Sequence, residues 1–269
     1  MARVPRQTCV PVLTMKPFLK FGVLLLLLSS TALGASEGDS LPSADAVIEA
    51  MLAHNAQRQA QLAGYRGMRE YVLENQRWHK RAEMLVRVEG DADETKHFEV
   101  EKEEGWKSAQ KHVLRKMLDS EAEGSSREIR SSTRLSEENY EFHMVSAAML
   151  DGRKSYLIAV VPKRREERLF EGKIWVDAQD YALVRVEGKP AKNPSFWIRS
   201  VHFVHTYKKS GPFWFPLLTE SVTDVRIFGS TSLDISYFDY APNSLAAPES
   251  ASAELPGEVI RYEKNRSPE

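Results

Sequence analysis

Apolar residues recur with a helical period near the start of the chain. Val47 and Met51 are spaced to share one face of a helix over residues 43–63. Ser43 is a suitable N-cap and Gly64 a suitable stop. The pattern predicts one amphipathic helix that begins the folded domain.

From Tyr65 onward the period changes to two. Residues 65–75, 77–91 and 94–106 each alternate apolar and charged positions, as Met84, Val86 and Val88 do against their charged neighbours. Alternation of this kind is typical of antiparallel strands with one buried face and one solvated face. We therefore predict three consecutive antiparallel strands.

The alternation stops between residues 108 and 134. Four apolar residues of this stretch have helical spacing: Val113, Leu114, Met117 and Leu118. Ser125 and Glu128 have the spacing of a capping box that opens a second short helix. A helical insert is thus expected inside a β sequence, covering a sheet face or the mouth of a barrel.

Strand patterns resume after Asn139 and continue to Tyr240 with short turns between them, which gives roughly nine to eleven strands in all. A meander of this length is expected to curl, because long open sheet edges invite aggregation. The predicted fold class is α+β, mainly β: an incomplete antiparallel β-barrel whose apolar concave side is covered by the N-terminal helix and the helical insert. The domain is expected over residues 43–240, followed by a disordered tail over residues 241–269, which is rich in proline and small residues.

The first 34 residues are basic and then apolar. Four basic residues and no acidic ones precede the run of residues 21–28, and Ala32 and Gly34 provide small residues at an exit site. This is the pattern of a secretory signal peptide cleaved after Gly34, with residues 35–42 as a linker. The apolar run is shorter than a membrane-spanning helix requires, and no later segment is apolar enough to span. The sequence predicts a protein that acts outside the cytoplasm, without a transmembrane span in its mature chain.

Composition and motifs exclude several classes of function. The single cysteine, Cys9, lies in the leader, so a disulfide framework or a Cys-based zinc site is excluded. The net charge of −1 offers no global field for nucleic acid. His202 and His205 lie three apart on a predicted strand and therefore face opposite sides, so they are not expected to share a metal ion. We expect no enzyme activity, no metal and no cofactor.

Aromatic residues are concentrated in the second half of the chain. Eleven of them are expected to contribute to a large apolar inner face: Trp175, Phe196, Trp197, Phe203, Tyr207, Phe213, Trp214, Phe215, Phe228, Tyr237 and Phe238. Such a face either packs as a core against a helix or encloses a cavity for an acyl chain. A basic run at residues 163–165 is a solvated edge or a contact for an anionic surface.

Three segments resemble the bacterial outer-membrane lipoprotein-sorting (LolA-like) superfamily. They read GRKSYLIAVVPK (residues 152–163), EGKIWVDAQDYALVRVEGK (171–189) and GPFWFPLLTES (211–221). The resemblance covers residues 43–240 and implies an incomplete β-barrel around a helical lid, with acyl chains held inside. It also implies an early-strand arginine that holds the lid, a role open to Arg66, Arg69, Arg77, Arg81 and Arg87.

The expected function is a periplasmic, non-enzymatic carrier or binding protein for a lipid or for the acyl chains of a lipoprotein. The alternative is an envelope sensor or interaction module of the same fold that binds a membrane-protein partner. Expected partners are a lipid or acylated protein and an inner- or outer-membrane receptor, with no nucleic acid. The candidate apolar lining is Ile174, Val176, Val201, Phe203, Val225 and Ile227.

Overall fold

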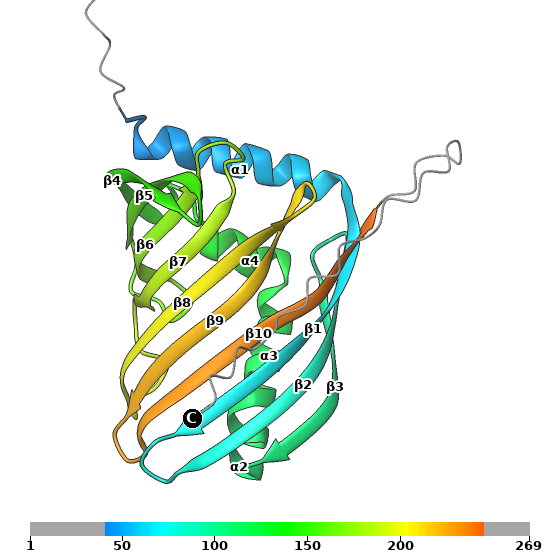
Figure 1. The fold of residues 1–269 in the computed structure, drawn as a ribbon. Coiled ribbons are helices and arrows are strands. Elements are labelled where there is room, and N and C mark those ends of the chain that lie inside the picture. The colour runs from blue at the N-terminus through cyan, green and yellow to red at the C-terminus, as the bar shows by residue number, and fades with distance from the viewer. Residues whose placement is uncertain (1–40, 245–269) are drawn as a thin grey trace, which may run out of the picture. The chain divides into compact units, whose positions relative to one another are not determined.

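The computed structural model describes residues 41–244. The expected signal peptide, almost all of the linker and residues 245–269 of the expected tail lie outside these residues. Ten strands form a single antiparallel sheet in the order β3-β2-β1-β10-β9-β8-β7-β6-β5-β4 (Figure 1). The predicted fold class is confirmed: the protein is mainly β, with an open, curved sheet, an N-terminal helix and a helical insert.

The elements follow one another with short connections. The helices are α1 (Ala44–Ala60), α2 (Lys107–Ala109), a π-helical turn (Gln110–Leu114), α3 (Arg115–Gly124) and α4 (Arg127–Thr133). The strands are β1 (Leu62–Asn75), β2 (Lys80–Asp91), β3 (Lys96–Gly105), β4 (Tyr140–Leu150), β5 (Arg153–Pro162), β6 (Phe170–Asp177), β7 (Leu183–Pro190), β8 (Ile198–Ser210), β9 (Phe213–Val225) and β10 (Gly229–Ser244).

Helix α1 begins where its cap residue predicts. The Ser43 hydroxyl accepts a hydrogen bond from the amide of Ala46 at 3.2 Å, which satisfies a free N–H of the first turn. The helix ends at Ala60, however, and the predicted stop, Gly64, lies inside β1 with φ +140°. A Cβ at position 64 would lie 2.6 Å from the carbonyl oxygen of Gly90 on β2, so this glycine permits close strand pairing instead of ending the helix.

The first and last strands pair with each other. β1 lies between β2 and β10, with Leu62 opposite Ser244 at one end and Asn75 opposite Thr231 at the other. Because its end pairs with the start of β1, β10 continues past the boundary expected at Tyr240. The edge strands are then β3 and β4, and the helical insert is the chain that connects them.

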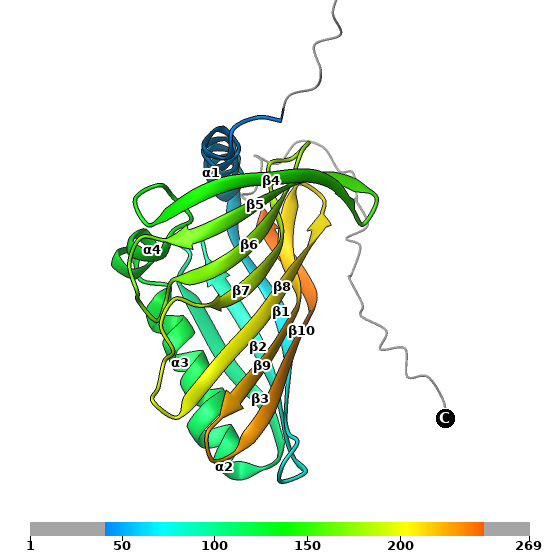
Figure 2. The same cartoon turned by 90° about the vertical axis from the view of Figure 1, so that its left-hand side faces the viewer.

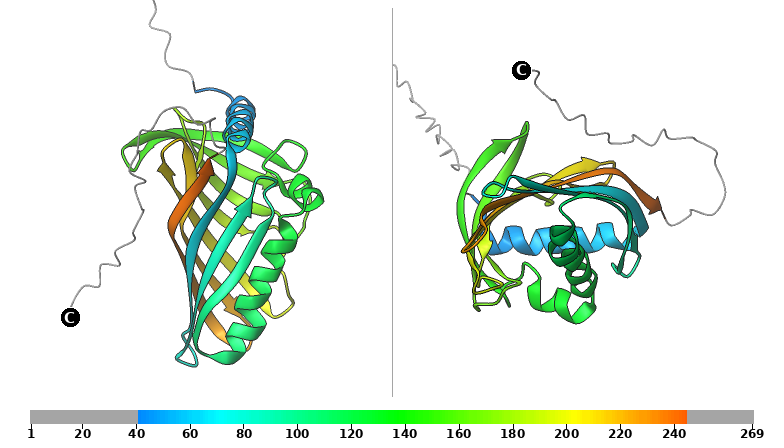
Figure 3. Two further views of the ribbon diagram at one scale, coloured as in Figure 1. Left: turned by 90° about the vertical axis from the view of Figure 1, so that its right-hand side faces the viewer. Right: turned by 90° about the horizontal axis from the view of Figure 1, so that it is seen from below.

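Seen from below, the sheet curves around α1 and the insert, which both lie on its concave side (Figure 3). Leu114 and Leu118 of the insert are buried, whereas Val113 and Met117 are exposed, so only half of the expected apolar set faces the sheet. The predicted capping box is wrong by one position: Ser126 is the N-cap of α4 and makes no side-chain cap bond, while the Ser125 hydroxyl donates to the carbonyl of Ala122.

Two separate clusters of buried side chains fill the concave side. The first joins the insert to β1, β2, β9 and β10 and includes Met84, Val86, Val88, Leu114 and Leu233. The second joins α1 to β4–β7 and includes Val47, Ile48, Met51, Ile158, Ile174 and Val176. We call these two clusters the half-cores of the sheet. A closed barrel has a single core.

The same substitution at a buried and at an exposed valine tests this core. Val86→Ala removes two buried methyl groups from the first cluster, and we expect it to lower the free energy of unfolding by about 2 kcal/mol. Val222→Ala, on an exposed side of β9, is expected to change it by less than about 0.5 kcal/mol. Urea unfolding of both variants measures the difference, and equal effects would contradict the assigned inner face.

Candidate functional site

An arginine is buried at the centre of the concave side. Arg69 of β1 is 2% exposed. Its Nη1 lies 2.8 Å from Oε2 of Glu121 and its Nη2 lies 3.2 Å from Oε1 of the same residue, which belongs to α3. Its Nε donates to the hydroxyl of Tyr240 at 3.0 Å and its Nη1 to that of Tyr71 at 3.3 Å. One guanidinium thus joins β1 and β10 to the helical insert.

The surroundings of this ion pair keep it charged. The Arg69 guanidinium lies 5.0 Å from the ring centre of Tyr237 and 5.3 Å from that of Phe98, and Lys96 Nζ lies 2.8 Å from Glu121 Oε1. Burial acts to raise the pKa of Glu121, but Lys96 and Arg69 together outweigh burial and lower that pKa to about 2. Paired charges of this kind are costly to separate inside a protein.

Arg69 is the one of the five candidate arginines that contacts the insert. Arg66, Arg77, Arg81 and Arg87 are all exposed. Arg81 pairs with Glu74 and Glu83, and Arg87 pairs with Glu101 on the neighbouring strand. The sequence could not separate these alternatives, because an arginine at any alternating strand position is normally taken to face solvent.

A chain of hydrogen bonds leads from Tyr237, which lies beside Arg69, toward β8. The Tyr237 hydroxyl lies 3.0 Å from Thr219 Oγ1, which in turn lies 2.7 Å from Nδ1 of His205. Burial lowers the pKa of His205 and so favours its neutral form. The other histidine of the pair, His202, faces the opposite side beside Glu187, as the spacing predicted. The inner face is therefore crossed by polar groups and is not the uniformly apolar surface that the aromatic pattern suggested.

Helices α1 and α4 lie toward the same end of the half-barrel (Figure 2), and residues of both line a cavity of about 1000 Å³. Its apolar walls come from both half-cores. Met51, Leu52, Leu135, Leu183 and Tyr207 belong to the second cluster or pack against it. Leu62, Phe213 and Phe215 belong to the first. The cavity lies between the two half-cores, and neither of them fills the space under α1.

The mouth of this cavity is basic. Arg58, Arg127, Arg130 and Arg134 line it together with one acidic residue, Glu94. Arg130 pairs with Glu94 at 2.8 Å, and Arg58 donates to the carbonyl oxygens of Asp180 and Tyr181. Arg127 and Arg134 are exposed and form no ion pair within residues 41–244. The mouth thus presents two free guanidinium groups above apolar walls.

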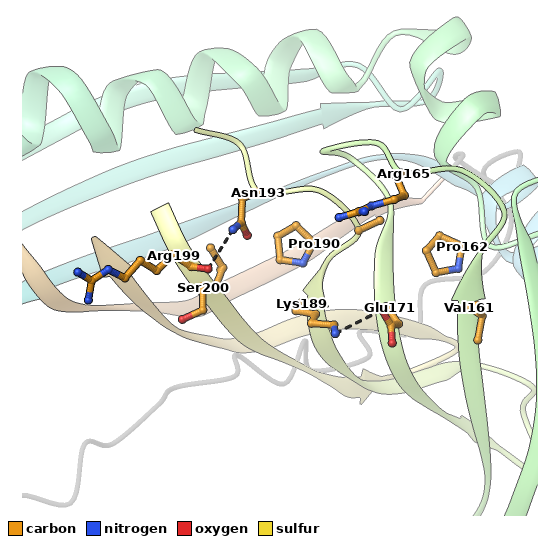
Figure 4. A pocket seen from close by; sticks show the side chains of 11 residues that line it. Val161, Pro162, Arg165, Glu171, Lys189, Pro190, Asn193, Arg199 and Ser200 are labelled. Carbon is orange, nitrogen blue, oxygen red and sulfur yellow. Dashed lines mark hydrogen bonds and ion pairs between the residues drawn. The ribbon is translucent and has the colours of Figure 1, made fainter. Parts of the chain in front are cut away.

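A smaller cavity of about 510 Å³ lies at the ends of β5–β8 (Figure 4). Val161, Pro162 and Pro190 line it together with the ion pair of Lys189 and Glu171, whose charged atoms are 3.3 Å apart. Asn193 donates from one wall to the carbonyl oxygens of Ile198 and Arg199. Its lining is more mixed than that of the larger cavity and offers no continuous apolar wall.

The structure does not bring the six lining residues predicted from sequence together. Ile174 and Val176 are fully buried in the second cluster, Phe203 packs against that cluster, and Val225 is half-buried. Val201 lines the smaller cavity. Ile227 is 51% exposed because β9 ends at Val225, so the alternation that placed Ile227 on the inner face does not extend to it. None of the six borders the larger cavity.

Three of the aromatic residues expected on the inner face are exposed. Phe196, Trp197 and Phe228 lie in connections between strands and not on strands. The basic run at residues 163–165 is partly used within the fold, since Arg164 pairs with Glu166 and donates to Asn139 and to the carbonyl of Ser132.

Neither a spanning helix nor a metal site is found in the described part of the chain. No helix between residues 41 and 244 is long and apolar enough to cross a membrane. The same residues contain no group of three or more His, Cys, Asp or Glu side chains placed to hold a metal ion.

Comparison with known proteins finds one family model that matches part of the chain and several solved structures that are similar to it. Residues 135–241 match a family of unknown function, DUF5686, and no curated protein matches the chain. Similar solved structures include a DUF1329 family protein from Desulfovibrio piger (9% identity, TM-score 0.39, covering 77% of this chain and 96% of that one). A putative outer membrane lipoprotein-sorting protein domain from Vibrio parahaemolyticus (12%, 0.36, 75% and 95%) and a LolA superfamily protein from Nitrosomonas europaea (10%, 0.34, 77% and 96%) are also similar.

The similarity to LolA-like proteins expected from the sequence is thus present among known structures. At these identities and TM-scores the similarity says nothing about the function of this chain.

Replacing the buried arginine tests whether it holds the insert. Arg69→Met leaves the Glu121 carboxylate half-buried with only Lys96 beside it, and we expect the free energy of unfolding to fall by about 3 kcal/mol. Arg87→Met breaks an exposed ion pair on β2 and is expected to cost less than about 1 kcal/mol. Urea unfolding measures both, and amide exchange in α3 should increase in the first variant alone. Unchanged exchange in α3 would contradict the proposed tie.

Acid should weaken the same contact in a defined range. Because the pKa of Glu121 is lowered from 4.5 to about 2 in the folded protein, its carboxylate stabilises the fold above pH 4.5 and loses this effect as the pH falls toward about 2. Glu121→Gln should therefore be less stable than the wild type above pH 4.5, with a difference that shrinks in acid. Urea unfolding over that pH range measures the difference, and a gap independent of pH would refute the assignment.

Proposed function

We propose that this chain is a non-enzymatic binding protein for amphiphiles with acyl chains, either a lipid or an acylated protein. The observation that carries the proposal is the cavity beneath α1, whose apolar walls come from both half-cores and whose mouth holds unpaired arginines. Its volume of about 1000 Å³ is at the upper end of what small-molecule sites enclose.

The apolar walls would supply the affinity. Each methylene group that leaves water stabilises the complex by about 0.8 kcal/mol, so a long chain gains far more than a short one. Part of this gain is offset, since α1 packs against β4–β7 through Val47, Ile48 and Met51 and has to shift for a long chain to enter. Binding should therefore increase with chain length up to the length that fills the cavity.

The basic mouth would favour an anionic head group. Arg127 and Arg134 can each donate two parallel hydrogen bonds to a phosphate or carboxylate. Their positions on and just after α4 place them above the apolar walls, at the level where the head group of a bound amphiphile would lie.

The chain is proposed to act outside the cytoplasm, after removal of residues 1–34. The basic and apolar pattern of that segment supports export. Ile174, Val176 and Phe203 belong to the second cluster or pack against it, and they would support the cavity wall without contacting the ligand.

Filling the cavity provides the test. Leu52→Trp adds bulk to a half-buried residue that lines the cavity, and we expect it to weaken uptake of a long-chain fatty acid at least about tenfold. Val222→Trp adds the same ring to an exposed side of β9 and should leave uptake unchanged. Titration with a fluorescent fatty acid measures uptake, and circular dichroism verifies that both variants fold.

The same titration tests whether the arginines at the mouth of the cavity favour a negatively charged head group. Arg127→Glu combined with Arg134→Glu should weaken binding of the fatty acid more than binding of its uncharged alcohol. Organic extraction and mass spectrometry of the purified wild type should recover a bound amphiphile. A folded wild type that carries no lipid and takes up none would refute the proposal and leave the alternative, an interaction module for a protein partner.

A further inference from the structure

Four segments far apart in the sequence meet at the end of the half-barrel opposite α1. They are the β1–β2 turn, the β7–β8 connection, the β9–β10 turn and the start of the helical insert (Figure 1). Arg77 Nη1 donates to the carbonyl of Ile227 at 2.9 Å, and the Arg226 amide donates to that of Trp197 at 2.8 Å. The ring of Trp106 lies 6.4 Å from that of Phe228. These contacts make one continuous surface.

Large apolar side chains protrude from this surface into solvent. Trp78 is 51% exposed, Phe196 75%, Trp197 53%, Ile227 51% and Phe228 43%. We call these five residues the aromatic end. Single exposed apolar residues are common on proteins, but several gathered at one end mark a surface that binds something.

The three turns that carry the aromatic end contain basic but no acidic residues. Residues 76–82, 192–199 and 226–233 contain arginines and lysines but no aspartate or glutamate. Three of the basic groups lie beside rings: Arg226 is 4.6 Å from the centre of Phe196, Arg77 is 5.8 Å from that of Trp78, and Lys80 Nζ is 5.4 Å from that of Trp106. Arg81 and Arg199 of these segments are paired with flanking carboxylates. Arg226, Arg77 and Lys80 still give the apolar tips basic neighbours, although the chain as a whole is slightly acidic.

We propose that the aromatic end docks on an anionic lipid bilayer. Tryptophan is enriched at the level of the lipid head groups, and phenylalanine on a membrane-facing surface is buried at the boundary between head groups and acyl chains. Arginine and lysine next to them are attracted by the negative surface potential of anionic lipids. The rings project from separate turns at one end of the molecule. A bilayer accepts inserted rings without a surface of complementary shape, whereas a folded protein partner would need one. This combination favours a bilayer over a folded protein partner.

Docking in this way would fix the orientation of the molecule. Residues of α1 and α4 line the cavity, and α1 lies at the end opposite the β1–β2 and β9–β10 turns (Figure 2). A protein bound through its aromatic end therefore holds the mouth of the cavity away from that bilayer, toward the aqueous phase. The docking surface shares no residue with the walls of the larger cavity, so it does not depend on what the cavity binds.

Flotation with lipid vesicles tests the proposal. The purified full chain is mixed with vesicles of phosphatidylcholine alone or of phosphatidylcholine with phosphatidylglycerol. We expect the wild type to float with the anionic vesicles and much less with the neutral ones. Phe196→Ser combined with Trp197→Ser should weaken binding to the anionic vesicles at least about tenfold. Arg77→Gln combined with Lys80→Gln should weaken it by about fivefold for each charge removed.

The control removes exposed apolar side chains elsewhere. Val145→Ser combined with Met149→Ser acts on β4, where both residues are exposed, and should leave flotation unchanged. Trp78→Ser gives a second, independent variant of the aromatic end and should weaken binding as well. If the wild type does not float with anionic vesicles, or if the aromatic-end variants float as well as the wild type and the control, the proposal is overturned.

Discussion

The contact between Arg69 and Glu121 holds the two kinds of structure in this protein together. The sheet closes on neither side, since its edge strands β3 and β4 are joined only by the helical insert. Leu114 and Leu118 are buried and pack the insert against the sheet. The bidentate ion pair fixes the position of α3 relative to the sheet. A buried guanidinium is stable only while all its partners are present, so the position of the insert is specified by charge as much as by packing.

An open sheet also explains why a cavity remains. A closed barrel of about eight strands is small enough to be filled by its own side chains. Here the buried apolar side chains form two half-cores, and the polar contacts of Arg69 with Glu121, Tyr71 and Tyr240 lie within the first of them. Each half-core packs against its own helices. The space between the two half-cores, under α1, is not filled and forms the cavity.

The sequence predicted the elements well and the long-range contacts poorly. Alternation at Met84, Val86 and Val88 identified a buried strand face, and Ser43 identified the start of α1. Pairing of β1 with β10 joins residues more than 150 positions apart and leaves no local signal. Alternation predicted the burial of Val86 correctly and that of Ile227 wrongly. It applies only within a strand, and β9 ends at Val225, two residues before Ile227. Burial of Arg69 depends on Glu121 and Tyr240, which no local pattern connects to it.

The distribution of arginines then separates the molecule into three levels. Arg127 and Arg134 lie at the mouth of the cavity and have no ion-pair partner among residues 41–244. Arg69 is enclosed and paired at the centre, and Arg77 and Arg226 lie beside exposed rings at the far end. The enclosed arginine is neutralised by its own chain and stabilises the fold. The outer ones retain their charge and lie next to apolar surface. A guanidinium kept beside apolar side chains at the surface is suited to a partner that is itself amphiphilic, and this chain presents that combination at both ends.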